Sequence, residues 1–330
     1  MNGKALLIKV LKQQIGERIP WVPFAGIHAG KLKGYTATEI LRDGNKLLEC
    51  LLEVNRVYSP DGQPIVFDLQ IEAEILGCKM KWADKAPPSV DSHPLASTLD
   101  IPDKIPAKTE GRIPLILDVM TKFKEKVGEK TALFGLICGP LTLALHLRGT
   151  QLFMDMIRNR DYANKLLQYT TKICQVMSDY YIEAGMDVIA VVDPVVSQIS
   201  ARHFKSFLSE PLALIFKYIR DKNILSSFFV CGDATKNLEV MCQTLPDSIF
   251  IDENINMTEA KAITDKHNVT LGGNIPLTTT MLYGTQQDCM KYVVGLIDSL
   301  GHNNLVIAPG CDMPDRKSTR LNSSNRIRYR

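Results

Sequence analysis

The sequence predicts a (β/α)8 TIM barrel, in which eight parallel strands alternate with helices. Short apolar segments rich in β-branched residues recur eight times and end in polar residues. Helical patterns separate most of these segments, and strand–helix alternation without strand pairs predicts a parallel sheet. The alternative is a doubly wound open sheet, but no G-x-G-x-x-G follows the first segment.

The predicted strands each combine an apolar body with a polar carboxyl end. In chain order they cover residues 19–24, 64–69, 132–138, 187–193, 225–231, 248–252, 270–275 and 304–308. The longest predicted helix covers 161–184, with apolar residues at about every third or fourth position. Further helices are predicted over 37–57, 112–127, 201–221, 235–245, 258–267 and 285–300. The first twenty residues predict an ordinary helix, because lysines are scattered through it and no small-residue cleavage site follows.

Residues 1–315 are predicted to form one domain, interrupted by an insertion at about 79–114. This insertion is rich in proline and serine and is too long for a neutral connection. We expect it to be an active-site lid or rim, or else a surface loop over the barrel mouth. Residues 316–330 carry six basic residues and no acid. They resemble translated vector or adapter sequence, with a solvated extension as the alternative, so we expect the barrel to lack its native last helix.

Charge and cysteine usage narrow the class of protein. The formal net charge is +3, but without the tail it becomes −3. A slightly acidic body without a basic stripe argues against nucleic acid as a partner. No apolar run reaches the roughly 18 to 20 residues that span a bilayer, so no membrane partner is expected. The eight cysteines lie far apart without a CxxC motif, which favours a cytoplasmic location.

Two cysteines at strand ends are the strongest functional signal. Cys231, in FFVCGD, ends the fifth predicted strand, and Cys311, in APGCD, follows the eighth. The carboxyl ends of barrel strands carry the chemistry, and an adjacent glycine lets the chain turn sharply there. Two thiolates make an incomplete site for a soft metal such as Zn²⁺, with a position open to a substrate thiol. The alternative is that both are small buried hydrophobic residues.

Other polar residues are expected at the same rim. His28 follows the first strand in FAGIHAG, and we expect it to contact substrate or ligand unless it is solvated or bonded to backbone. Asp193, in VVDP, and Glu72, in LQIEAE, are candidate catalytic residues that handle protons, although strand-end acids also cap helices. The candidates for substrate binding are His28, Gln70, Glu74 and Asn274.

With these residues in view, the chain resembles the uroporphyrinogen decarboxylase superfamily, and within it the methylcobamide:coenzyme M methyltransferase branch. The resemblance covers nearly all of residues 1–315. It is carried by ERIPWVPFAGIHAG, FDLQIEAEILGC, CGPLTLALHLRGT, IEAGMDVIAVVDP, FFVCGD, GGNIPL and LVIAPGCD. It implies a (β/α)8 barrel and zinc-dependent methyl transfer from a methylated corrinoid protein to a thiol, in anaerobic one-carbon metabolism. The implied cofactors are Zn²⁺ and a methylcobamide, and the implied partners are a corrinoid-binding protein and a small thiol or methylated small molecule.

In that branch the metal is held by a His-x-Cys pair after strand five and a cysteine after strand eight. The cysteines correspond to Cys231 and Cys311, but the histidine position holds Phe229, which cannot bind metal. Either another residue completes the site (His28 first, then Glu72 or Glu74), or zinc is bound weakly, or the chemistry differs.

Three alternative functions stay open within this resemblance. One is methyl transfer in the opposite direction, from a small donor to the corrinoid. Another is non-catalytic binding of a corrinoid or tetrapyrrole. Decarboxylation of a tetrapyrrole is less favoured, because PFAGIHAG has no arginine to hold substrate carboxylates.

Overall fold

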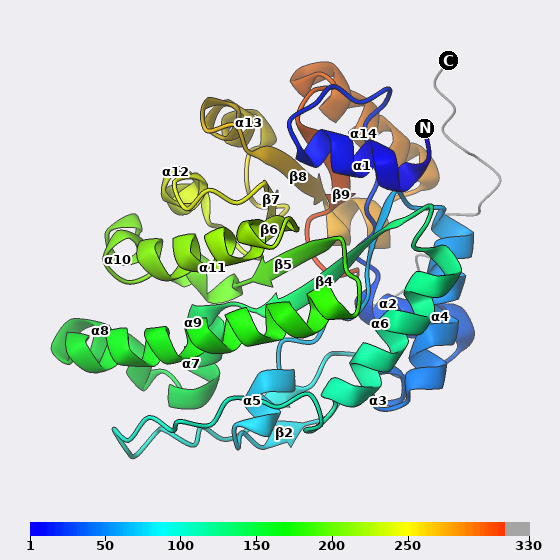
Figure 1. The fold of residues 1–330 in the computed structure, drawn as a ribbon. Coiled ribbons are helices and arrows are strands. Elements are labelled where there is room, and N and C mark those ends of the chain that lie inside the picture. The colour runs from blue at the N-terminus through cyan, green and yellow to red at the C-terminus, as the bar shows by residue number, and fades with distance from the viewer. Residues whose placement is uncertain (314–330) are drawn as a thin grey trace.

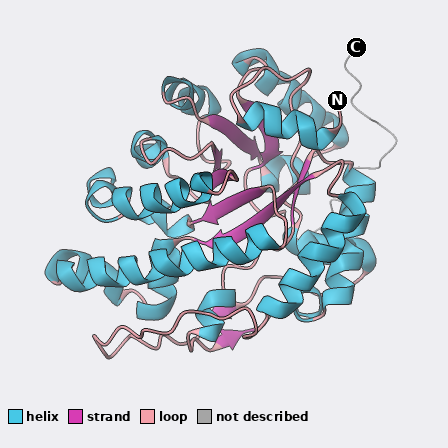
Figure 2. Cartoon of the chain, viewed as in Figure 1, coloured by secondary structure: helices cyan, strands magenta, loops and turns pink. Residues whose placement is uncertain are grey.

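The structure is a computed structural model that describes residues 1–313. Parallel strands form the centre of the molecule and helices surround them (Figures 1 and 2). The order in the sheet is β1-β4-β5-β6-β7-β8-β9, and every neighbouring pair is parallel. The strands are β1 (Gly62–Pro64), β4 (Ala132–Cys138), β5 (Val188–Val192), β6 (Leu225–Val230), β7 (Ser248–Ile251), β8 (Thr270–Ile275) and β9 (Leu305–Pro309). This curled sheet confirms the predicted TIM-barrel class.

Fourteen α-helices are described within residues 1–313. They are α1 (Gly3–Leu11), α2 (Gly26–Lys33), α3 (Ala37–Arg42), α4 (Gly44–Tyr58), α5 (Ile71–Ile75), α6 (Ile113–Val127), α7 (Pro140–Arg148), α8 (Gln151–Arg158), α9 (Arg160–Glu183), α10 (Ala201–Phe207), α11 (Ser209–Asp221), α12 (Leu238–Cys242), α13 (Met257–Lys266) and α14 (Gln286–Leu300). Short 3₁₀ segments lie at Pro194–Gln198 and Thr235–Asn237, and a π-helical segment lies at Leu277–Leu282. Within residues 1–313, no helix is long and apolar enough to cross a membrane.

The first predicted strand, residues 19–24, forms a single bridge instead of a strand. Trp21 pairs in parallel with Ile307 of β9, and the Trp21 carbonyl also accepts a hydrogen bond from the Asp61 N–H, next to β1. Pro20 and Pro23 flank this bridge, and proline has no N–H to extend a ladder. The segment therefore links the two edges of the seven-stranded sheet in the place of an eighth strand.

Two predicted helices are each divided in the structure. The segment 37–57 separates into α3 and α4 at Asp43, whose backbone is extended and whose carboxylate caps α4 through the N–H groups of Asn45 and Lys46. The segment 201–221 separates into α10 and α11 at Leu208. The first helix is confirmed as α1.

The barrel interior is apolar and is closed at its amino-terminal end by α1. Alternate residues of the strands face inward, as Ala132, Phe134 and Leu136 of β4 do, and Leu7 and Leu11 of α1 pack against them. At the opposite end of the same cluster lie Cys231 and Cys311. This layout leaves the carboxyl ends of the strands as the open mouth.

The insertion at 79–114 contains a short antiparallel pair, β2 (Met80–Lys81) with β3 (Ser89–Val90), and then runs along the outer helices. The Tyr180 hydroxyl of α9 donates to the Pro106 carbonyl (3.0 Å). The Arg148 guanidinium of α7 donates to the Thr98 carbonyl (2.9 Å). These contacts fasten the insertion to α7 and α9, and a lid function stays a prediction.

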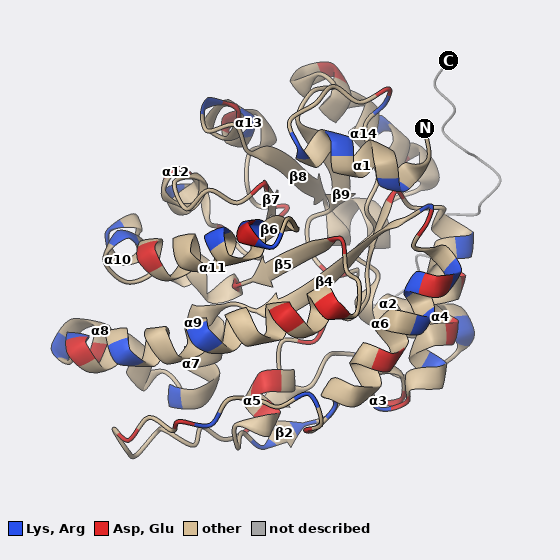
Figure 3. Cartoon of the chain, viewed as in Figure 1, with Lys and Arg blue, Asp and Glu red and all other residues tan. Residues whose placement is uncertain are grey.

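Charged residues of both signs are interspersed on the outer helices (Figure 3). The absence of a nucleic-acid partner stays a prediction. The tail at 316–330, and with it the expectation of a missing last helix, lies outside the described residues.

Candidate functional site at the barrel mouth

Cys231 and Cys311 meet at the mouth, as the strand assignment predicts, and the structure joins them in a disulfide. Cys231 directly follows β6 and Cys311 lies two residues after β9, and their Cα atoms are 6.0 Å apart. β7 and β8 lie between these two strands in the sheet, so the bond spans part of the opening. The sequence led us to expect two separate thiolates, and the disulfide is therefore a new feature of the site.

Glycines beside both cysteines permit this approach. Gly232 has φ +89°, in the left-handed region, and a Cβ there would lie 2.7 Å from the Ser197 hydroxyl oxygen. A Cβ on Gly310 would lie 2.6 Å from the backbone nitrogen of Glu253. A larger residue at either position would have to shift the chain that presents a cysteine to the mouth.

Below the cysteine pair lies a cluster of phenylalanine rings, which we call the aromatic floor; it consists of Phe24, Phe67, Phe134, Phe229 and Phe250. The ring of Phe24 lies 4.8 Å from that of Phe229 and 5.2 Å from that of Phe250. Phe229 is 2% exposed. Phe229, at the position where the resemblance implies a histidine, has a ring that packs into the barrel interior. The aromatic floor was not predicted from the sequence, although the alternation of inward-facing residues along the strands indicates Phe229 and Phe250.

His28 lies inside a helix and not in the predicted loop. It is fully buried in α2, and its Nε2 atom lies 2.8 Å from the Tyr58 hydroxyl of α4. The N-terminus of α2 is held by Asp312, whose carboxylate accepts a hydrogen bond from the Gly26 N–H (2.7 Å). Burial raises the pKa of Asp312 to about 7. The assignment of His28 as a metal ligand or substrate contact stays a prediction.

Asp193 and Glu72, the two predicted catalytic acids, are both buried, Asp193 after β5 and Glu72 in α5. Asp193 follows β5 and accepts hydrogen bonds from the Leu141 and Thr142 N–H groups, both at 2.9 Å, so it caps α7. Glu72, in α5, accepts a hydrogen bond from the Cys138 N–H at 3.3 Å. Burial raises the pKa of Asp193 to about 6 and that of Glu72 to about 7. Asp193 thus has the helix-capping function that was the alternative to catalysis for acids at strand ends.

Arg112, at the start of α6, ties together the acids that follow β1. Its guanidinium lies 2.5 Å from an Asp68 carboxylate oxygen and 2.8 Å from one of Glu74. Glu74, a predicted substrate contact, is therefore engaged in an ion pair, and Arg112 was not singled out from the sequence. The amide oxygen of Gln70 is buried and has no hydrogen-bond partner among the described residues.

Asn274, at the end of β8, is buried and holds the loop after β7. Its amide nitrogen donates to the carbonyls of Asp252 (2.9 Å) and Ile255 (2.8 Å). Its amide oxygen accepts a hydrogen bond from the Tyr292 hydroxyl (2.9 Å). These bonds occupy the side chain, and a contact between Asn274 and substrate stays a prediction.

The donor set at the mouth does not fit a zinc site held by three protein ligands. Among residues 1–313, no group of three or more His, Cys, Asp or Glu side chains is arranged to hold a metal ion. Cys231 and Cys311 supply two sulfurs, Phe229 supplies no donor, and His28 is bonded to Tyr58. The predicted set of Cys231, Cys311 and His28 is thus not assembled in this structure.

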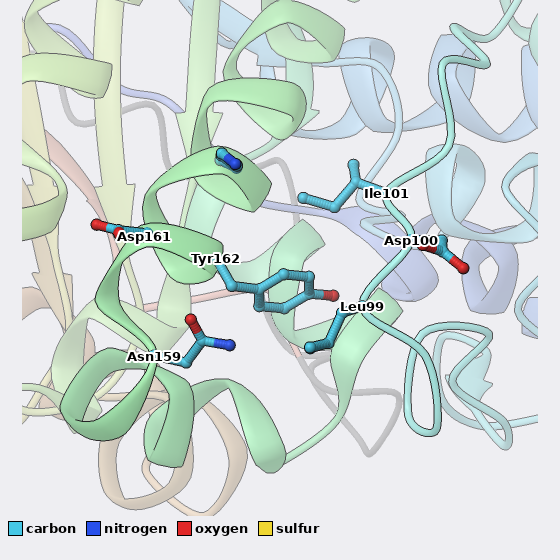
Figure 4. Close-up of a pocket in the computed structure, with 7 residues that line it drawn as sticks. Leu99, Asp100, Ile101, Asn159, Asp161 and Tyr162 are labelled. Atoms are coloured by element: carbon cyan, nitrogen blue, oxygen red, sulfur yellow. The ribbon is translucent and has the colours of Figure 1, made fainter.

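A separate cleft of about 450 Å³ lies between the insertion and the start of α9 (Figure 4). It is lined by Leu99, Asp100, Ile101, Asn159, Asp161, Tyr162 and Lys165. None of the predicted site residues lines it. The cleft is therefore distinct from the site at the barrel mouth.

Comparisons with known proteins agree with this architecture. The family model described as uroporphyrinogen decarboxylase (URO-D) matches residues 2–319. A methylcobamide:CoM methyltransferase, MtbA of Methanosarcina acetivorans, is 26% identical over 318 residues, which is 93% of this chain and 91% of that protein. MtaA of Methanosarcina barkeri, of the same description, is 30% identical over 254 residues, covering 74% of this chain and 71% of that protein. A solved methyltransferase from Methanosarcina mazei superimposes with a TM-score of 0.85 at 23% identity, covering 98% and 97% of the two chains, and shows the same fold.

Proposed function

The chain belongs to the uroporphyrinogen decarboxylase family, and we propose that it moves a methyl group between a corrinoid and a small thiol or similar acceptor. The observation that carries this proposal is the convergence of Cys231 and Cys311 at the mouth of a barrel. The methyltransferase descriptions of the relatives support it. We further propose that a corrinoid-binding protein presents the methyl carrier to this mouth, and that the reaction takes place in the cytoplasm.

The chain's own residues would act by position and by exclusion of water. The methylated corrinoid supplies an electrophilic methyl group when it is bound. The aromatic floor keeps water from the interior beneath the cysteines, and a dry, apolar surface there strengthens polar interactions just above it. In the reduced protein, Cys231 and Cys311 would face the entering thiol as thiolates, the form of cysteine that can ligate a soft metal.

We propose that zinc binds only to the reduced protein. The two thiolates of Cys231 and Cys311 are the soft donors that this mouth offers. A third ligand, with His28 as first choice and Glu72 or Glu74 next, remains part of the proposal. The described residues do not assemble three metal ligands, so the proposed transfer includes no step on the metal.

The buried acids are proposed to position the rim. Asp193 and Glu72, which we predicted to handle protons, would act on the reaction by holding α7 and the end of β4 in place. Gln70 is the predicted substrate-binding residue best suited to contact a ligand, because its buried amide oxygen lacks a partner among the described residues. Asn274 would support the mouth from β8, and His28 stays the candidate for ligand or substrate contact from α2.

The test is anaerobic demethylation of methylcobalamin by the reduced full chain with a panel of small thiols, followed by corrinoid absorbance. We expect activity with at least one thiol, and a loss of about a hundredfold, equal to ~2.7 kcal/mol, in Cys231→Ala. Cys289→Ser is the matched control, because Cys289 lies in α14 with its thiol directed to the Thr280 carbonyl, and it should keep the activity.

The reverse direction is tested with the same absorbance by adding methylated donors to cob(I)alamin. Activity in either direction that survives in both Cys231→Ala and Cys311→Ala would contradict the proposed site. Absence of methyl transfer in both directions in the folded, reduced protein would contradict the proposed function.

A further inference from the structure

Cys231 and Cys311 differ from every other cysteine in the chain. All eight cysteines lie in the described residues. These two are half-buried and joined, whereas the other six are free thiols, of which five are buried and Cys289 is half-buried. We propose that Cys231 and Cys311 form a thiol–disulfide exchange site that reacts with small thiols and disulfides at the barrel mouth. Its consequence for methyl transfer rests on the proposed function, but the exchange itself does not.

The position of the pair makes exchange accessible. Both residues pack against the apolar interior on one side and are partly exposed on the other, so the bond lies at the boundary between the core and solvent. The segment after Cys231 continues through Gly232 to the exposed Asp233. We therefore expect a small molecule that enters the mouth to reach this bond without unfolding of the barrel.

The other thiols are poor competitors. Burial raises the pKa of all six, which are Cys50, Cys78, Cys138, Cys174, Cys242 and Cys289. Because the thiolate is the attacking species in disulfide exchange, thiols held protonated and buried react slowly. Exchange is thus confined to the mouth.

The exchange balances with a small disulfide as the oxidant. The thiolate of one cysteine attacks the disulfide RSSR, forms a mixed disulfide and releases RS⁻. The thiolate of the second cysteine attacks the protein sulfur of that mixed disulfide, closes the Cys231–Cys311 bond and releases a second RS⁻. Two protein thiols are oxidised, one RSSR is reduced to two RSH, and the two cysteine protons pass to the released thiolates. An excess of a small dithiol reverses each step.

Closing the bond removes the thiolates that the mouth needs. A sulfur in a disulfide is neither a thiolate nucleophile nor a thiolate metal ligand. Disulfides in cytosolic proteins are usually transient and act in catalysis or redox sensing, which fits a pair placed at an open mouth. The oxidised form is therefore the inactive state of the proposed methyltransferase, and the dithiol is the active state.

The test is a thiol count on the full chain, which needs no activity assay. The protein is equilibrated without oxygen in mixtures of reduced and oxidised dithiothreitol, quenched in acid, denatured and labelled with N-ethylmaleimide for intact mass and peptide mapping. We expect eight labels in reducing mixtures and six in oxidising ones, with the missing pair mapped to Cys231 and Cys311. Eight labels in every mixture, or a pair that involves another cysteine, would overturn the proposal.

Two variants sharpen the count. Cys311→Ser should carry seven labels in every mixture, whereas the matched control Cys289→Ser should change from seven to five. If Cys311→Ser fails to fold, the peptide map of the wild-type chain still decides. Methyl transfer is then measured in the same mixtures. A change from eight to six labels without any methyl transfer would support thiol–disulfide exchange and contradict the proposed function. Methyl transfer with eight labels in every mixture would support the proposed function and contradict the exchange.

Discussion

After β6 and β9 the structure presents two half-buried cysteines bonded to each other, whereas after β1 and β5 it presents buried acids bonded to the scaffold. Asp193 caps α7, and Asp68 is held by Arg112. Both regions lie at the carboxyl end of the barrel, where chemistry is expected. Position in the barrel therefore does not separate the two regions. They differ in the bonds that their side chains make.

The difference follows from what each side chain needs when it is buried. A carboxylate taken out of water needs donors, and the N-terminus of a following helix or a nearby guanidinium supplies them. A cysteine is buried at little cost without any partner, so it can stay at the mouth and remain chemically available. We therefore call the ends of β6 and β9 the reactive region, and the network of Asp68, Glu74 and Arg112 the structural region.

The largest expected effect comes from breaking the structural region with Arg112→Met. Removing the guanidinium leaves the Asp68 carboxylate buried without its charge partner, which should cost about 3–5 kcal/mol in the free energy of unfolding. Urea unfolding measures this change. The matched control is Lys217→Ala, which breaks a pair with Asp221 in which the side chains are 64% and 59% exposed, and it should cost less than ~1 kcal/mol.

Adding Asp68→Asn and Glu74→Gln to Arg112→Met should recover part of the loss, because no buried charge is then left unpaired. Equal destabilisation by Arg112→Met and Lys217→Ala would contradict a structural function for this network.

Much of the fold was predictable because the spacing of apolar residues and the order of the strands can be read from a single sequence. β4, β8 and α9 lie close to their predicted ranges, and Cys231 and Cys311 meet as strand order implies. The split at Asp43 was harder to foresee, because a helical apolar pattern continues on both sides of it.

The candidate site was less predictable, because it depends on contacts between distant segments. The bond between His28 and Tyr58 joins α2 to α4, and Arg112 reaches Asp68 across 44 positions of sequence. The disulfide closes over 80 positions. The sequence predicts that a side chain lies at a strand end, but the residue that it bonds to determines whether it is free to react.

The next effect tests, through pH, a buried acid that lies close to the charges of the structural region, with Glu72→Gln. The folded-state pKa of Glu72 is raised to about 7 from the usual 4.5. Below pH 4.5 the group is protonated in both states, so its neutral form contributes fully to stability. Between pH 4.5 and 7 the unfolded chain releases the proton first, and stability falls as pH rises.

At 1.36 kcal/mol per pKa unit, the wild type should lose up to about 3 kcal/mol relative to Glu72→Gln over that pH range. Urea unfolding at several pH values from 4.5 to 7.5 measures the difference between the two chains. The titration of Asp193 contributes equally to both and cancels. Parallel stability curves for the two chains would show that the Glu72 carboxyl is solvated.

The smallest expected effect comes from Phe229→His, which tests the reactive region by creating a His-x-Cys pair from β6 and the residue that follows it. Residues 229 and 231 are two apart, so in an extended chain they point to the same side, and both pack against the barrel interior. The reduced variant should bind Zn²⁺ at least about tenfold more tightly than the wild type, a gain of ~1.4 kcal/mol, because a third donor joins the two thiolates. Competition with a chromophoric chelator without oxygen measures this affinity.

Phe250→His is the matched control, since it changes the same aromatic floor on β7 without a cysteine two residues later, and it should leave zinc affinity unchanged. If Phe229→His binds zinc no better than Phe250→His, then the two sulfurs do not face the position of residue 229, and the wild-type aromatic floor is not what keeps a third ligand from the cysteine pair.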